Sequence, residues 1–139
     1  MIIGATLSQT PYKVRTLQEE HYLRCGADIL LTGLQQDLEG EAKCVVCGTT
    51  VHLKMRKGRV YDLKPDNAIL HVVEIPIEEG KFRIECEATH LFDSEKCLRS
   101  WVGSYAGRPG GIFRPQEYLD RLSQGGKARV AFGSPRQPN

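Results

Sequence analysis

Residues 24–31 read Arg-Cys-Gly-Ala-Asp-Ile-Leu-Leu, a short polar stretch that leads into an apolar run. Residues three apart lie on one face of a helix, so a helix here would point the Cys25 thiol and the Asp28 carboxylate the same way. A soft metal ligand beside a proton carrier suits acid-assisted chemistry at a soft metal. The alternative is a buried thiol next to a solvated carboxylate. The pair supports a metal-binding function only if a second thiol lies close to it in the fold. Cys86, in the apolar segment 82–86, is the best candidate for that thiol.

The flanking sequence predicts that this motif lies on a helix. Thr16-Leu17-Gln18-Glu19 has the form of a capping box, so a helix is expected from Thr16 to about Leu34. Gly26 costs roughly 1 kcal/mol relative to alanine in a helix interior, which leaves a break or a second start near Cys25 open. A start there would place the thiol at a helix N-terminus, where the thiolate is favoured. Residues 1–15 show no sustained period and are predicted to form an N-terminal arm.

The central part of the chain predicts a sheet. Short runs rich in Val, Ile and Thr alternate with turn residues, and strands are expected at 42–46, 50–56, 59–63, 69–75 and 82–88. Asp93-Ser94 can cap a short helix, and Pro115 opens another. The predicted fold is therefore α+β, a mostly antiparallel sheet of hairpins packed by the helix that carries Cys-x-x-Asp and by a C-terminal helix. The expected domain covers residues 16–126, followed by a flexible tail at 127–139.

Length and composition exclude several classes of function. The chain has 139 residues and a formal net charge of +2, and no basic stripe favours nucleic-acid binding. No stretch has the form of a signal peptide or the length of a membrane span, so no membrane partner and a cytoplasmic location are expected. The five cysteines cannot all pair, and a reducing compartment would keep them as thiols.

The remaining thiols point to metal chemistry. Cys44-Val45-Val46-Cys47-Gly48 has the shape of a zinc knuckle. A closed site needs two further ligands, and Cys86 with His90, or Cys97, could supply them. Zinc or copper at Cys44 and Cys47 is therefore one interpretation of the motif. A redox pair is disfavoured because the flanks predict strand and turn rather than a helix start.

The order of these motifs resembles the catalytic domain of the organomercurial (alkylmercury) lyases, over roughly residues 20 to 122. The matching positions are Cys25 and Asp28 in residues 24–31, Cys44 in Lys-Cys-Val-Val-Cys-Gly, and Cys86 in Glu-Cys-Glu-Ala-Thr-His-Leu-Phe-Asp-Ser. The resemblance implies that Cys25 and Cys86 capture the mercury of R-Hg-X and that Asp28 acts as the acid. It gives Cys44 a structural role. Glu87 follows Cys86, where relatives often have a second cysteine.

The same resemblance implies the substrates and partners. Organomercurial small molecules would be cleaved to a hydrocarbon and Hg(II), with no required cofactor, and small thiols or a mercuric reductase would accept the ion. A homodimer stays among the alternatives. The rival function is a non-catalytic thiolate protein that binds Cu(I), Zn(II) or Hg(II) through Cys44, Cys47 and Cys86, and a zinc-stapled structural domain is a third hypothesis. Asp28 favours the enzyme, because a metal carrier needs no carboxylate beside its cysteine.

Overall fold

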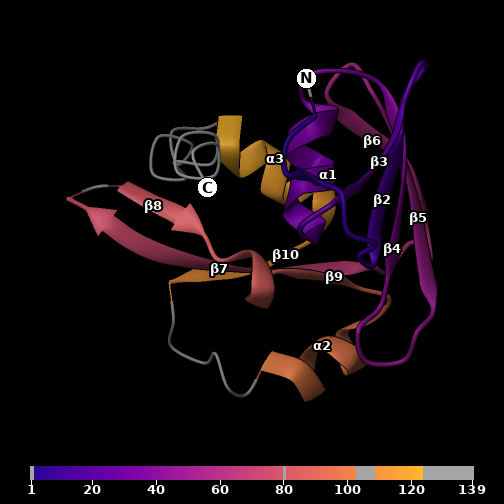
Figure 1. The fold of residues 1–139 in the computed structure, drawn as a ribbon. Helices are drawn as coiled ribbons and strands as arrows, with labels where there is room; N and C mark the ends of the chain where they lie inside the picture. The colour runs from indigo at the N-terminus through magenta and orange to yellow at the C-terminus, as the bar shows by residue number, and fades with distance from the viewer. Residues whose placement is uncertain (1, 80, 103–108, 124–139) are drawn as a thin grey trace.

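Two antiparallel sheets and three helices make up the structure, a computed structural model that describes residues 2–79, 81–102 and 109–123 (Figure 1). The α+β class predicted from the sequence is the observed one. In chain order the elements are β1 (Ala5–Thr6), β2 (Tyr12–Arg15), β3 (Glu20–Leu23), α1 (Gly26–Gly33), β4 (Leu38–Lys43), β5 (Thr50–Arg56), β6 (Arg59–Lys64), β7 (Ile69–Glu78), β8 (Lys81–Ile84), the 3₁₀ helix η1 (Cys86–Ala88), β9 (His90–Phe92), α2 (Glu95–Val102), β10 (Gly110–Phe113) and α3 (Pro115–Ser123).

The larger sheet has six strands in the order β1-β3-β2-β4-β5-β6, and every neighbouring pair is antiparallel. Its inner face is apolar because side chains alternate along each strand. On β5, Val51, Leu53 and Met55 are buried, whereas His52 and Arg56 are exposed. The strand expected at 50–56 is therefore confirmed, with the face assignment that its alternation predicts.

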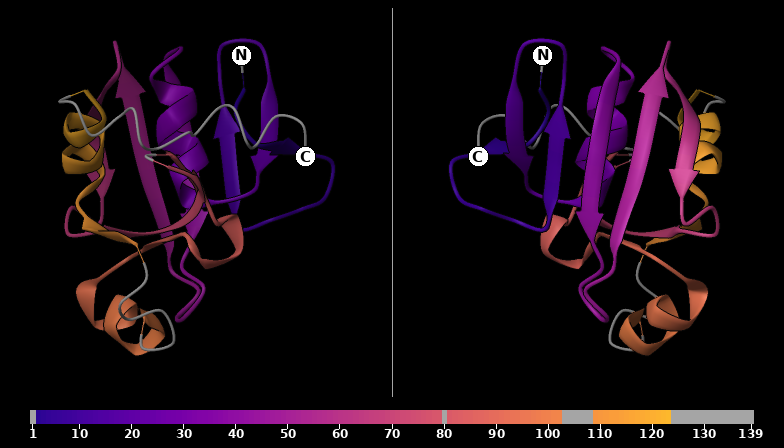
Figure 2. Two further views of the ribbon diagram at one scale, coloured as in Figure 1. Left: turned by 90° about the vertical axis from the view of Figure 1, so that its left-hand side faces the viewer. Right: turned by 90° about the vertical axis from the view of Figure 1, so that its right-hand side faces the viewer.

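The smaller sheet is built on β7, which pairs with β10, β8 and β9. Helix α1 lies between the two sheets, and all eight of its residues are buried. The smaller sheet separates α1 and α3 on one side from α2 on the other (Figures 1 and 2). None of the helices in the described ranges has the length and apolar composition needed to cross a membrane.

The helix predicted from Thr16 to Leu34 is shorter than expected. The backbone N–H of Thr16 donates to the Glu19 carbonyl at 2.8 Å, and the Glu19 N–H donates to the Thr16 hydroxyl at 3.3 Å. These bonds close the turn between β2 and β3, and the helix begins only at Gly26. The sequence pattern of a capping box does not distinguish a helix start from this turn, because both use a hydroxyl–amide bond three residues apart.

Other boundaries also differ from the predictions. Residues 2–15, expected as an arm, contain β1 and β2, and β2 pairs on both of its edges. The strand expected at 42–46 is β4, which ends at Lys43, so Cys44 to Cys47 form a turn. The strand expected at 82–88 ends at Ile84, before η1. The predicted tail, 127–139, lies outside the described residues.

Candidate active site

Cys25 and Asp28 lie at the start of α1, in the middle of the protein. Cys25 is the N-cap residue, with extended backbone angles (φ −154°, ψ 171°), and the Asp28 N–H donates to its carbonyl at 3.1 Å. Both side chains are fully buried. The free N–H groups and the dipole of a helix start favour negative charge, so this position suits a thiolate and a carboxylate.

Cys86 reaches the same place from a distant part of the chain. It is the first residue of η1, after β8, and it is partly buried. The sulfur atoms of Cys25 and Cys86 and a carboxylate oxygen of Asp28 all lie within 4.8 Å of one another. We call these three residues the thiol–acid cluster. The structure thus brings together the three residues that the sequence analysis singled out as catalytic.

The two thiols of this cluster differ in access to solvent, and the pKa of the more accessible one is shifted. The pKa of Cys86 is lowered, first by a hydrogen bond with Cys25 and then by the positive charges of Arg24 and Arg83, while burial and Glu87 act in the opposite direction. Cys25 is completely buried, whereas Cys86 keeps part of its surface in solvent. Cys86 is therefore the thiol that an incoming electrophile meets first, and the one that ionises more readily than an ordinary cysteine.

The N-terminal segment, residues 2–4, covers Asp28. The Ile3 N–H donates to the Thr32 hydroxyl at 2.9 Å, and the Arg24 N–H donates to the Gly4 carbonyl at 3.0 Å. Gly4 has a φ of +77°, and a Cβ atom added there would lie 2.0 Å from Oδ2 of Asp28. Only glycine lets the backbone lie this close to the carboxylate, so this segment forms part of the wall around the acid.

A buried polar pair that sequence reasoning missed lies beside the cluster. The Tyr12 hydroxyl is hydrogen-bonded to Nδ1 of His90, whose Nε2 lies 3.0 Å from the Glu87 carbonyl. Because a carbonyl only accepts, Nε2 carries the proton and Nδ1 accepts from the tyrosine. Burial lowers the pKa of His90, and burial and the nearby Cys25 raise the pKa of Tyr12. The alternation of Tyr12 with Val14 was the available signal, although a strand of four residues gives it little weight.

A second group of thiols lies elsewhere. The sulfur atoms of Cys44, Cys47 and Cys97 and a carboxylate oxygen of Asp93 also lie within 4.8 Å of one another. We call these four residues the Cys3Asp cluster. Of the two completions considered for the knuckle, the structure has the one with Cys97, because Cys86 belongs to the thiol–acid cluster. Asp93 was not predicted, since a carboxylate that precedes a helix usually serves as a cap.

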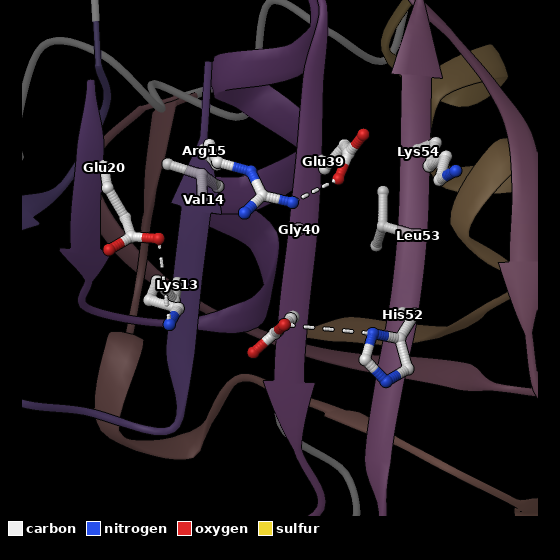
Figure 3. Close-up of a pocket in the computed structure, with 10 residues that line it drawn as sticks. Lys13, Val14, Arg15, Glu20, Glu39, Gly40, His52, Leu53 and Lys54 are labelled. Carbon is white, nitrogen blue, oxygen red and sulfur yellow. Dashed lines mark hydrogen bonds and ion pairs between the residues drawn. The ribbon is translucent and has the colours of Figure 1, made fainter. Parts of the chain in front are cut away.

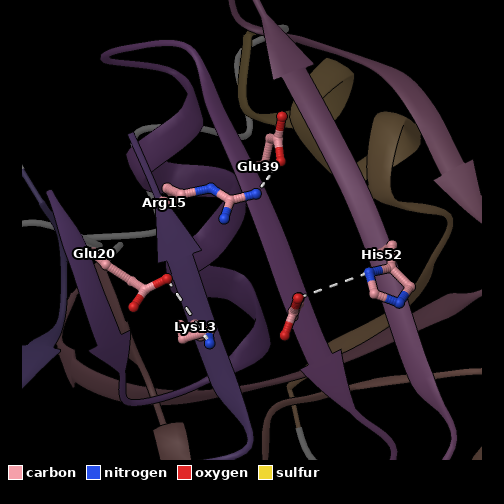
Figure 4. A network of polar contacts seen from close by, with 6 residues as sticks. Lys13, Arg15, Glu20, Glu39 and His52 are labelled. Atoms are coloured by element: carbon pink, nitrogen blue, oxygen red, sulfur yellow. Dashed lines mark hydrogen bonds and ion pairs between the residues drawn. The ribbon is translucent and has the colours of Figure 1, made fainter. Parts of the chain in front are cut away.

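A groove on the outer face of the larger sheet is a different kind of surface (Figure 3). It is lined mainly by charged side chains, and the residues that line it include no cysteine. Several of these side chains form exposed cross-strand pairs (Figure 4), and pairs of this kind contribute little to stability. The pairs are Arg15–Glu39, Lys13–Glu20 and His52–Glu41, with nitrogen–oxygen distances of 2.6, 3.9 and 4.0 Å.

Comparison with known proteins agrees with the resemblance seen in the sequence. A family model described as MerB alkylmercury lyase matches residues 5–124. A crystal structure of the mercury-bound form of MerB2 has a similar fold, with a TM-score of 0.67 and 18% sequence identity over 90% of this chain. The match covers 62% of that protein, so this chain spans less than two thirds of its length. No curated protein sequence matches the chain. The predicted fold is confirmed by these similarities.

Proposed function

This chain belongs to the alkylmercury lyase family, and on that premise we propose that it cleaves the carbon–mercury bond of organomercurials by protonolysis. The observation that carries the proposal is the thiol–acid cluster. Two thiols and one carboxylic acid, drawn from α1 and η1, converge within 4.8 Å in a buried setting. Thiolates select a soft metal ion, and the carboxyl group can carry the proton that the carbon must receive.

In the first step of the proposed reaction, the Cys86 thiolate attacks the mercury of R-Hg-X and displaces X⁻. A free cysteine of pKa about 8.5 is only a few per cent ionised at neutral pH. The lowered pKa of Cys86, caused first by the hydrogen bond from Cys25 and then by Arg24, increases the share that can attack. Its partial exposure lets a bulky organomercurial reach the sulfur.

In the second step the buried thiol of Cys25 also binds the mercury. Cys25 transfers its proton to the Asp28 carboxylate and binds mercury as a thiolate. The second thiolate increases the electron density on mercury and weakens its bond to carbon. Asp28 then gives its proton to that carbon, R-H leaves, and Hg(II) stays bound to two sulfurs with its oxidation state unchanged. The Cys25 proton thus ends on the hydrocarbon, the proton of Cys86 having left to solvent when that thiol ionised, and the Asp28 carboxylate is regenerated.

Exclusion of water supports the role of Asp28. The carboxyl group is fully buried, and residues 2–4 lie across it. A proton held in such a site is directed to the bound substrate rather than to solvent. Small thiols or a mercuric reductase would then take Hg(II) from Cys25 and Cys86. A soft ion bound to thiolates prefers thiolate ligands, so it leaves the protein by transfer to other thiolates.

The test is anaerobic incubation of the purified chain with methylmercury or phenylmercury and excess small thiol, with methane or benzene measured by gas chromatography. Asp28→Asn preserves the shape of the side chain but removes its acid. The exposed Asp66 provides the matched control, Asp66→Asn. Hydrocarbon release over many turnovers in the parent and in Asp66→Asn, together with loss in Asp28→Asn, supports the lyase. Mercury binding without any hydrocarbon from the parent chain would refute it.

A further inference from the structure

The Cys3Asp cluster is built from two separate pieces of chain, and the first is the turn between β4 and β5. The Cys44 N–H donates to the Thr49 carbonyl and the Gly48 N–H donates to the Cys44 carbonyl, both at 2.9 Å. Gly48 has a φ of +81°, in the left-handed region that favours glycine. These bonds fold the Cys-x-x-Cys segment into a tight knuckle that brings the sulfur atoms of Cys44 and Cys47 together.

The second piece is the start of α2. Ser94 caps this helix, since its hydroxyl accepts from the Cys97 N–H at 3.3 Å and its carbonyl accepts from the Leu98 N–H at 3.1 Å. Asp93 precedes the cap and Cys97 lies in the first turn, so the same helix start presents a carboxylate and a thiol. Neither the knuckle nor the helix start alone has enough ligands for a closed metal site.

We propose that Cys44, Cys47, Asp93 and Cys97 bind one Zn(II) as a structural site. Tetrahedral zinc with Zn–S bonds of about 2.3 Å needs sulfur atoms roughly 3.8 Å apart. The four ligand atoms already lie within 4.8 Å of one another, so small side-chain movements close the site. Four protein ligands fill the coordination shell of zinc and leave no position for a substrate, which is the arrangement of structural rather than catalytic sites.

The carboxylate decides which metal is favoured. Cu(I) is a soft ion that selects thiolates and thioethers, whereas zinc accepts sulfur, nitrogen and carboxylate oxygen. A set of three sulfurs and one Asp93 oxygen therefore fits Zn(II) better than Cu(I). Cys47 is exposed and Cys44 is buried, so the ion can enter from solvent at one end of the cluster and be enclosed at the other.

The weak packing around α2 explains why a metal at this site would stabilise the structure. This helix lies on the far side of the smaller sheet from α1 (Figure 1). Among the described residues, the hydrophobic cluster beside it has three buried side chains, Cys44, Phe92 and Leu98, with Trp101 among the partly buried residues packed against them. So small a core supplies little stability, and small structural units commonly gain the remainder from a metal or a disulfide. Zinc would fasten α2 to the β4–β5 turn, independently of the thiol–acid cluster.

The experiment measures metal content. The full chain is produced in medium that contains zinc and copper and is purified without chelators. The amounts of zinc and copper per chain are then measured by elemental mass spectrometry. We expect one zinc per chain in the parent, and less than a tenth of that in Asp93→Asn and Cys97→Ser. Cys86→Ser, which removes a thiol of the other cluster, should keep its zinc. One equivalent of copper in place of zinc would overturn the metal assignment, and equal loss in Cys86→Ser would overturn the ligand assignment.

A second measurement does not depend on whether the variants fold. The parent chain is stripped of metal and titrated with Co(II), which reports tetrahedral thiolate ligands through its visible absorption bands and sulfur-to-metal charge transfer. Saturation at one equivalent, with a rise in Tm when zinc is added instead, is the expected result. Purified protein that holds less than a tenth of an equivalent of zinc and shows no such bands with Co(II) would refute the site.

Discussion

Replacement of Gly4 by alanine tests whether the N-terminal segment holds Asp28 in place. The chain offers a matched control, because Gly4 and Gly58 share a φ of +77°. Among the described residues, a Cβ atom at Gly58 would meet only Leu34 Cδ2, at the ordinary distance of 3.9 Å, whereas one at Gly4 would lie 2.0 Å from Asp28 Oδ2 and 2.4 Å from its Cγ. Both substitutions therefore place alanine in the left-handed region at the same φ, and of the two only Gly4→Ala brings the new methyl group onto the carboxylate.

The expected magnitudes follow from these contacts. Alanine in the left-handed region costs roughly 1–2 kcal/mol, which should be the whole loss of unfolding free energy in Gly58→Ala. Overpacking adds about 1–3 kcal/mol, so Gly4→Ala should lose roughly 2–5 kcal/mol in total. Displacement of a catalytic group by about 1 Å can cost 10²-fold in rate, and hydrocarbon release should fall by that order in Gly4→Ala alone.

Urea unfolding and gas chromatography of the released hydrocarbon measure the two effects on the same protein samples. Capture of mercury should persist in Gly4→Ala. The three atoms nearest to the added methyl group all belong to Asp28, and none belongs to Cys25 or Cys86. The reasoning is refuted if Gly4→Ala and Gly58→Ala lose equal stability and release hydrocarbon at the same rate. Residues 2–4 would then lie beside the acid without positioning it.

Three further predictions concern neighbouring groups. Cys25→Ser should still capture an organomercurial at Cys86, located by peptide mass mapping, but should release no hydrocarbon; cleavage in this variant would contradict the two-thiol mechanism. Arg24→Gln removes a positive charge that lowers the pKa of Cys86, so the rate of mercurial capture should reach its plateau at higher pH than in the parent, and an unchanged profile would argue against this electrostatic effect. Tyr12→Phe leaves the buried imidazole without its hydrogen-bond donor and should cost about 1–3 kcal/mol of unfolding free energy, whereas the exposed Tyr61→Phe should cost almost nothing.

The sequence predicted the parts of the site that depend on local pattern. The spacing of Cys25 and Asp28 places both at one helix start, because helix geometry is fixed by the backbone. The alternation along residues 50–56 predicts the buried face of β5 correctly for the same kind of reason. The roles of Cys25, Asp28 and Cys86 in catalysis remain predictions, as do the domain limits at residues 16–126.

Features that depend on distant chain segments could not be predicted. Asp93 and Cys97 meet the knuckle because β9 passes beside β4, and no local pattern encodes that contact. The pairing of β2 was missed because a strand of four residues, Tyr12–Arg15, alternates too briefly to stand out. The Thr16–Glu19 turn was predicted to be a helix start because a turn of this kind and a helix N-terminus share the hydrogen bond between the hydroxyl and the amide three residues later.

The attachment of the N-terminal segment has a consequence for how the interior opens. Strand β1 pairs with β3 through only two residues, Ala5 and Thr6, at the edge of the larger sheet. Beyond these, residues 2–4 are held by the Arg24–Gly4 backbone bond, by the bonds between Ile3 and Thr32, and by the packing of Ile2 and Ile3 against the main core. Loss of these contacts would expose the acid while the other strand pairs stay intact, so we expect opening to be a sub-global event that costs less than unfolding. If the chain is the lyase proposed above, the rate at which bulky organomercurials enter should therefore respond to changes in the edge strand that leave the core packing unaltered.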